Sequence, residues 1–262
     1  MKLYFSTNIY RGYEFDRILP YLEKFPGKLG IEVFPMFHEE AFEPVLKSCL
    51  EALNNTFTSF HEPYYFADHT KAAGTPEYER TMDMTRQTLY YMEEIGSKYM
   101  VYHHNNCDVD PAEREALLEV SRKNFREIEK LCAEKGILLA VENAGVGPKA
   151  IFNEEEFIRE CRMLKCPVLI DIGHAFANGW NLERVMEELS VQIISYHLHN
   201  NDGVHDSHRR IHDGKLDFDS FLDRCRNITP NADLVLEYSM AVADDVQGIE
   251  EDMRFLLEEK RI

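Results

Sequence analysis

Short apolar runs, rich in β-branched and aromatic residues, alternate along the chain with longer stretches in which apolar residues recur every three or four positions. The first pattern predicts buried parallel strands, and the second predicts amphipathic helices that pack against them. The helical period is clear around Leu117, Phe125 and Ile128. The expected strands span residues 3–7, 29–34, 56–61, 99–103, 137–143, 168–171, 193–199 and 234–238.

Several of the helical stretches begin with residues that favour helix starts. Asp110 is followed by Pro111 and then by Glu113, which predicts a capped helix from that point. Asn153 and Glu156 form a second capping box, and the pair Thr75-Pro76 predicts another helix start. We therefore expect a helix between successive predicted strands.

Eight strand and helix units follow one another in 262 residues without a Gly/Ser-rich linker. We therefore expect an α/β protein that folds as a single (β/α)8 TIM barrel over residues 1–262. A doubly wound sheet is the alternative. The barrel is favoured because polar residues stand at the carboxyl ends of six predicted strands, where barrel enzymes gather their functional groups, namely His61, His103, Glu142, Asp171, His199 and Glu237.

Composition agrees with a globular protein that has a large core, since 44% of the residues are hydrophobic. No stretch of the roughly 18 residues that a membrane helix needs is free of charge. The amino-terminal residues enter a strand pattern directly, so we expect a cytoplasmic protein. The six cysteines are dispersed without a C-x-x-C pair and are expected to be reduced, and none is a candidate nucleophile.

The chain carries 29 Lys and Arg against 47 Asp and Glu, a formal charge of −18. Such a charge repels phosphate backbones, and no Lys/Arg-rich stretch marks a groove-binding loop. Nucleic acid is therefore not the expected partner, and neither is a membrane. The expected partner is therefore a small molecule. The sequence does not decide whether the chain assembles into homo-oligomers.

Four of the strand-end residues form a set that suits a divalent cation. Isolated buried charges are costly, and a shared metal ion would relieve that cost. Three carboxylates and one imidazole suit manganese, zinc, magnesium, cobalt or iron, and the absence of thiolates disfavours soft metals. The predicted metal ligands are Glu142, Asp171, His199 and Glu237.

The loops after the sixth and seventh strands add further candidates. Gly173 allows the chain to turn sharply after Asp171, so His174 is expected to face the same cavity. Asp206 and His208 are two residues apart, which in extended chain puts both on one side and suits a further metal or a substrate clamp. Five other histidines, all outside the strand-end set, are expected to be exposed to solvent, namely His38, His69, His104, His205 and His212.

These segments resemble the motifs of the xylose isomerase-like barrel superfamily, in order and over nearly the whole chain: Val-Glu142-Asn, Asp171-Ile-Gly-His174, His199-Asn-Asn-Asp, Asp206-Ser-His208 and Leu-Glu237. That superfamily includes isomerases and epimerases of sugars and sugar phosphates, inosose-processing enzymes and the endonuclease IV family of apurinic endonucleases. The resemblance implies one divalent metal, held by the four predicted ligands.

In the isomerase and epimerase branch the resemblance implies that Glu142 and Glu237 are catalytic and move a proton through an enediolate of a small carbohydrate, while His174 touches substrate oxygens. The remaining rim residues would bind substrate, and Arg209 could receive a phosphate. Those substrate-binding candidates are His61, His103, Asp206, His208 and Arg209.

The endonuclease branch remains the alternative, with up to three metals and phosphodiester hydrolysis. The resemblance then implies additional metal ligands, namely His61, His103, His174, Asp206 and His208. A third class, a sugar-binding barrel without catalysis, would have no need for the paired glutamates. Glu32 is expected to play a supporting role, and the aromatic rim residues are expected to pack in their loops or to wall the pocket: Tyr64, Tyr65, Phe66 and Trp180.

Overall fold

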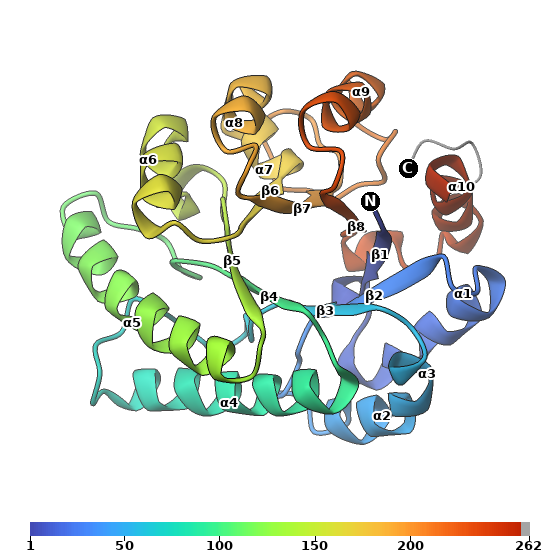
Figure 1. Ribbon diagram of the computed structural model, residues 1–262, viewed down its shortest axis with the longest axis horizontal. Coiled ribbons are helices and arrows are strands. Elements are labelled where there is room, and N and C mark those ends of the chain that lie inside the picture. The colour runs from blue at the N-terminus through green and yellow to red at the C-terminus, as the bar shows by residue number, and fades with distance from the viewer. Residues whose placement is uncertain (258–262) are drawn as a thin grey trace.

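Eight parallel strands close into a barrel in the computed structural model, which describes residues 1–257. Each strand pairs with the next, and the first and last strands close the ring through Leu3 with Leu234 and Phe5 with Leu236. Figure 1 shows the helices arranged around the outside of this ring. The strands are β1 (Leu3–Ser6), β2 (Leu29–Val33), β3 (Thr58–Phe60), β4 (Tyr99–Tyr102), β5 (Leu138–Glu142), β6 (Val168–Asp171), β7 (Ile193–Leu198) and β8 (Asp233–Leu236).

The (β/α)8 barrel predicted from the sequence is therefore confirmed, and the doubly wound alternative is wrong. All eight expected strands are present, with ends that differ by up to two residues. The helices are α1 (Leu19–Lys24), α2 (Phe42–Ser48), α3 (Leu50–Asn54), α4 (Pro76–Ile95), α5 (Arg114–Glu134), α6 (Glu154–Leu164), α7 (Ile172–Ala177), α8 (Leu182–Glu188), α9 (Phe218–Ile228) and α10 (Val246–Leu257), with short 3-10 turns η1 (Thr7–Ile9), η2 (Gly12–Ile18), η3 (Gly147–Lys149) and η4 (Met240–Val242).

The helix starts follow the capping signals in two of three cases. Thr75 accepts a hydrogen bond from the backbone of Tyr78, and Asn153 forms a full capping box with Glu156. The expected start near Asp110 is wrong, because Asp110 instead closes a turn by accepting from the amide of Ala112, and α5 begins at Arg114. None of the helices in residues 1–257 is long and apolar enough to cross a membrane.

The core has two parts. A large cluster of buried side chains fills the layer between the strands and the surrounding helices. A smaller cluster of Tyr99, Val101, Ala140 and Leu169 fills the interior of the barrel. These packed side chains lie below the carboxyl ends of the strands, so the polar side chains at the strand ends face a common space above them.

Candidate metal centre

Three carboxylates surround one imidazole at the centre of the barrel mouth. Nδ1 of His197, on β7, lies 3.3 Å from Oε2 of Glu142 and 3.2 Å from Oε2 of Glu237, which follows β8. The same nitrogen lies 4.0 Å from Oδ2 of Asp171, at the end of β6. All four side chains are buried, so the charges meet with little solvent to screen them.

Strand register explains why His197 takes this place. His197 pairs directly with Asp171 across β6 and β7, so the two side chains stand at one level of the barrel. The predicted ligand His199 lies two residues further along, and it belongs to a different group of candidate ligands with Asp171, His174 and His208. The geometry thus adds His197 as a candidate ligand, while His199 stays a predicted ligand that contacts Asp171 at 3.0 Å.

His197 is itself held from behind by a buried glutamate. Oε1 of Glu32, on β2, lies 2.8 Å from Nε2 of His197, and Oε2 of Glu32 accepts a hydrogen bond from the Ser59 hydroxyl at 3.1 Å. A carboxylate at Nε2 fixes the orientation of the ring, so that Nδ1 faces the other carboxylates. The supporting role expected for Glu32 has this geometric basis.

A second group of ligands lies beside the first. His61 and His103 stand after β3 and β4, with their Nε2 atoms 3.1 Å apart, and Nε2 of His103 lies 3.0 Å from Oε2 of Glu142. Nδ1 of His103 lies 3.0 Å from Oδ1 of Asn106, whose amide donates to Glu62 at 2.9 Å. The Asn106 contact favours a proton on Nδ1 of His103 and a lone pair on Nε2.

The start of α7 brings His174 to the other side of the centre. Asp171 caps this helix, because its Oδ1 accepts from the amide of His174 at 2.6 Å. Gly173 is required in between, since a Cβ there would overlap the ring of His199. Nδ1 of His174 lies 3.4 Å from Oε1 of Glu142, which agrees with the expectation that His174 faces the same cavity as the strand-end carboxylates.

Asp206 bridges His174 to His208. Its Oδ2 lies 3.3 Å from Nε2 of His174, and its Oδ1 lies 3.1 Å from Nε2 of His208. His208 has a φ of +41°, a left-handed conformation, and its ring stacks on that of His199 with centroids 3.7 Å apart. The loop after β7 therefore holds Asp206 and His208 toward the centre, although not as the extended chain that the sequence predicts.

The charges around the centre shift the pKa values of its acids in opposite directions. Burial alone would raise the pKa of Glu142, but the facing imidazoles of His197 and His103 bring it well below its usual range. Burial raises the pKa of Glu237 to about 7, although His197 acts against the change. The pKa of His197 is well above its usual range despite burial, because Glu237, Glu32 and Glu142 surround it.

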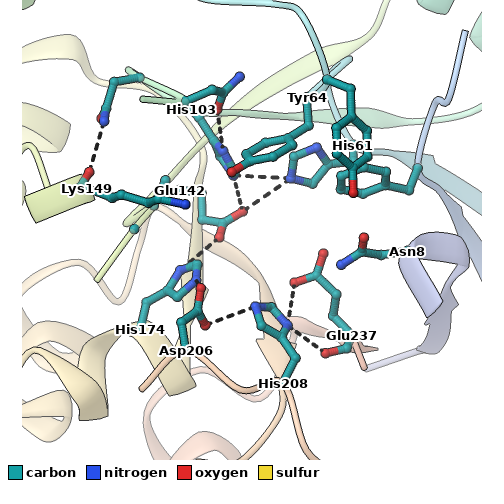
Figure 2. Close-up of a pocket in the computed structure, with 16 residues that line it drawn as sticks. Asn8, His61, Tyr64, His103, Glu142, Lys149, His174, Asp206, His208 and Glu237 are labelled. Carbon is teal, nitrogen blue, oxygen red and sulfur yellow. Dashed lines mark hydrogen bonds and ion pairs between the residues drawn. The ribbon is translucent and has the colours of Figure 1, made fainter. Parts of the chain in front are cut away.

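A cavity of about 200 Å³ opens over these side chains. Figure 2 shows His103, Glu142 and His174 along one side of it, with Asn8 and Glu237 across from them and Tyr64 beside His61. Ligand pockets for drug-sized molecules measure ~300–1,000 Å³, so this cavity suits a smaller ligand.

The structure brings most of the predicted site residues to this cavity but not all of them. Arg209 is exposed and does not line the cavity, and its backbone pairs in both directions with Asn200 at 3.0 Å. Tyr64 and Tyr65 do line the cavity. Phe66 is 63% exposed and Trp180 packs on Phe157, so neither of them walls it.

Two of the five histidines expected in solvent are buried instead. His69 pairs with Glu62, and His104 contacts the Ser121 hydroxyl at 2.9 Å. The expectation is wrong for both residues because each ring packs on Tyr102 of β4, and the ring of His104 also stacks on Phe125 of α5. His205 and His212 are exposed, as expected.

The residues present fit a divalent cation. Nδ1 of His197 and Nδ1 of His174 are buried and have no hydrogen-bond partner within residues 1–257. Each faces carboxylate oxygens at 3.2 to 4.0 Å, the arrangement expected where an ion would share its ligands. The groups whose ligand atoms lie close enough are Glu142 with Asp171 and His197; Glu32 with His197 and Glu237; His61 with His103 and Glu142; and Asp171 with His174, His199 and His208.

Fold and site together define a TIM barrel with a cluster of histidines and carboxylates at its carboxyl rim. Residues 21–259 match the family model of the xylose isomerase-like TIM barrel, so the chain belongs to that family. Among curated relatives, the uncharacterized protein MJ1614 of Methanocaldococcus jannaschii is 27% identical over 179 residues, which is 68% of each chain.

The fold is shared with many solved structures, among them the following three. A D-tagatose 3-epimerase-like protein superposes with a TM-score of 0.76 at 18% identity, over 100% of both chains. The IOLI protein with a bound zinc atom gives 0.77 at 15% identity, over 99% of both chains. An AP endonuclease of family 2 from Brucella melitensis gives 0.70 at 16% identity, over 93% of this chain and 96% of that one.

Proposed function

We propose that this protein is a divalent-metal-dependent isomerase or epimerase of a small sugar, polyol or sugar phosphate. The observation that carries the proposal is the placement of Glu142 and Glu237. Their carboxylates approach Nδ1 of His197 from different strands, at 3.3 and 3.2 Å, and both line the cavity. Two proton-transfer groups beside one small-molecule space are what proton exchange at a carbon next to a carbonyl requires.

Glu142, Asp171, His197 and Glu237 are the ligands that we propose for the central ion. The donor set of imidazole nitrogen and carboxylate oxygen suits manganese, zinc, magnesium, cobalt or iron. A divalent cation bound there would supply Lewis-acid polarisation of a substrate carbonyl. We expect one ion. The flanking histidines could bind additional ions, up to three in total.

The roles of the chain's own residues follow from their positions. Glu142 and Glu237 would remove a proton from the substrate carbon and return it. Return on the opposite face gives epimerisation, and transfer along one face gives isomerisation. His174 lines the cavity 3.4 Å from Glu142 and would hold a substrate oxygen. Tyr64 and Tyr65 would cover the substrate and limit access of water.

The comparisons support the proposal of a metal-dependent isomerase or epimerase, since the similar structures include a D-tagatose 3-epimerase-like protein and a barrel with a bound zinc atom. A shared fold at such low sequence identity does not show that two proteins catalyse the same reaction, so the proposal depends on the residues of the site.

The test is turnover of a panel of ketoses, polyols and ketose phosphates by protein loaded separately with manganese and with zinc. Glu142→Gln and Glu237→Gln should each lower turnover by about 10²- to 10⁴-fold, the usual contribution of a general acid or base. Glu160→Gln is the matched control, because Glu160 is equally buried but pairs with Arg122 outside the cavity. Full activity in both site variants would remove the proposed proton-transfer roles.

Phosphodiester hydrolysis is the second candidate, and one observation favours it. His61 with His103 and His174 with Asp206 and His208 flank the central set on both sides, as a cluster of several metals would require. One similar structure is described as an AP endonuclease. The charge of −18 opposes binding to DNA. Cleavage of DNA with an abasic site at low salt tests it, and no cleavage with zinc or manganese would exclude it.

A further inference from the structure

Lys149 stands at the mouth of the cavity as its single lysine or arginine among the described lining residues. It ends the turn η3, between β5 and α6. Figure 2 shows its side chain extending inward, toward Glu142. A lysine at the entrance of a site built from carboxylates and imidazoles is unusual in a chain with a formal charge of −18, so its position needs an explanation.

The loop that carries Lys149 is held from both sides. The amide of Asn105, a buried side chain, donates to the carbonyls of Lys149 and Cys107 at 2.9 Å each. Asn178 accepts from the amide of Gly147 and donates to the carbonyl of Gly145. These contacts fix the backbone from which the exposed Lys149 projects.

Gly145 shows how closely this loop is folded. Its φ is +84°, and a Cβ there would stand 2.6 Å from the carbonyl oxygen of Lys149. Only glycine adopts that conformation without strain and leaves room for the carbonyl. The turn that presents Lys149 is therefore specified by local sequence as well as by the two asparagines.

The described part of the chain supplies no carboxylate partner for Lys149. Within residues 1–257 its ammonium group forms no ion pair, although many other basic side chains do. Arg210, in the loop after β7, is by contrast held by Asp252 and Asp245 at 2.8 and 2.9 Å. An unpaired lysine that points into a binding cavity leaves a charge for the ligand to match.

We propose that Lys149 recognises an anionic group, a phosphate or a carboxylate, at one end of the substrate. The inference rests on the proposed isomerase or epimerase function and narrows its substrate class to charged sugars. Lys149 and Asn8 stand on opposite sides of the cavity in Figure 2, with Glu142 and Glu237 between them. A substrate that spans the cavity would place its anionic end at Lys149 and its reacting carbon near the glutamates.

The test compares the binding of three probes to metal-loaded protein by calorimetry: a neutral ketohexose, its 6-phosphate and the corresponding keto-uronate. Lys149→Met is the test variant. Lys215→Met is the matched control, because Lys215 is an exposed lysine of the same rim that does not line the cavity. The measured quantity is the ratio of Kd for the neutral probe to Kd for each anionic probe.

We expect a ratio of about ten or more for wild type with at least one anionic probe, the value for one charge-assisted hydrogen bond. The ratio should fall to near one in Lys149→Met and stay unchanged in Lys215→Met. Whichever probe is favoured tells phosphate from carboxylate. A ratio near one in wild type, or equal ratios in wild type and Lys149→Met, overturns the inference.

Turnover of the same probes separates this inference from the function on which it rests. Turnover of the neutral ketohexose without an anionic preference leaves the isomerase or epimerase standing and removes the role of Lys149. A preference that depends on Lys149, with no turnover of any probe, supports anion recognition and counts against the proposed function. Absence of both binding and turnover removes the two together.

Discussion

Oε1 of Glu32 lies 2.8 Å from Nε2 of His197, and both side chains are fully buried in the barrel interior. The pair joins β2 to β7 across the barrel, and it aims the other ring nitrogen of His197 at Glu142 and Glu237. Glu32 does not line the cavity, and its contact with the centre that the hydrogen bonds show is the one to the His197 imidazole.

Replacing Glu32 by Gln should therefore weaken metal binding at the centre by about 10- to 100-fold, the usual effect of a partner behind a histidine ligand. The variant keeps the shape of the side chain but removes the charge that holds the proton on Nε2. Titration of metal-free protein with zinc or manganese measures the change. Ser59→Ala is the control, since it removes only the hydrogen bond at the far oxygen of Glu32 and should have a smaller effect. Equal affinities in wild type and Glu32→Gln would contradict this role.

The two histidines of the β7 segment should differ in the same titration. His197→Gln should lower the affinity of the central ion by more than tenfold, because Nδ1 of His197 is the imidazole nitrogen that faces both glutamates. His199→Gln is the matched control, with equal burial and a contact to Asp171. Circular dichroism of both variants would establish that the fold is retained. A greater loss in His199→Gln would instead support His199, the ligand predicted from the sequence.

The sequence predicts the barrel and most of the site because both depend on local patterns. Apolar runs that end in a polar residue mark where each strand reaches the rim, which is why Glu142, Asp171 and Glu237 could be chosen. His197 and His199 could not be told apart, because residues two apart on a strand share a face. Their depth depends on the register of Asp171 with His197, which no local pattern encodes.

Loop residues were harder to predict for a related reason. Asn106 and Glu62, which support His103, lie in irregular segments where periodicity carries no information. Arg209 does not line the cavity, although its sequence neighbours Asp206 and His208 do. Contacts between segments decide such orientations.

Gly173→Ala should destabilise the protein by about 1–3 kcal/mol, because the added methyl group would overlap the ring of His199 in a packed interior. Denaturant unfolding of the metal-free protein measures the effect. The double variant Gly173→Ala/His199→Ala provides the control, since loss of the ring makes room for the methyl group and the added cost should shrink. Strict additivity of the two substitutions would show that the overlap is not the cause.

His104 should make the protein less stable in acid. Burial, together with the positive charge of Arg122, lowers the pKa of His104 from 6.5 to about 3, so the folded protein keeps this ring neutral where the unfolded chain takes up a proton. The contribution is fully present above pH 6.5 and is lost as the pH falls toward 3, because the unfolded state then binds the extra proton.

His104→Phe isolates this contribution, because it removes the titrating ring and leaves every other acid and histidine in place. The free energy of unfolding should fall more steeply between pH 6.5 and pH 4 in wild type than in the variant, by on the order of a few kcal/mol. Denaturant titrations of metal-free protein across that range provide the measurement. The variant also loses the contact with the Ser121 hydroxyl, which shifts its curve by a constant amount without changing its slope. Parallel curves for the two proteins would mean that His104 is protonated in the folded state as readily as in the unfolded chain.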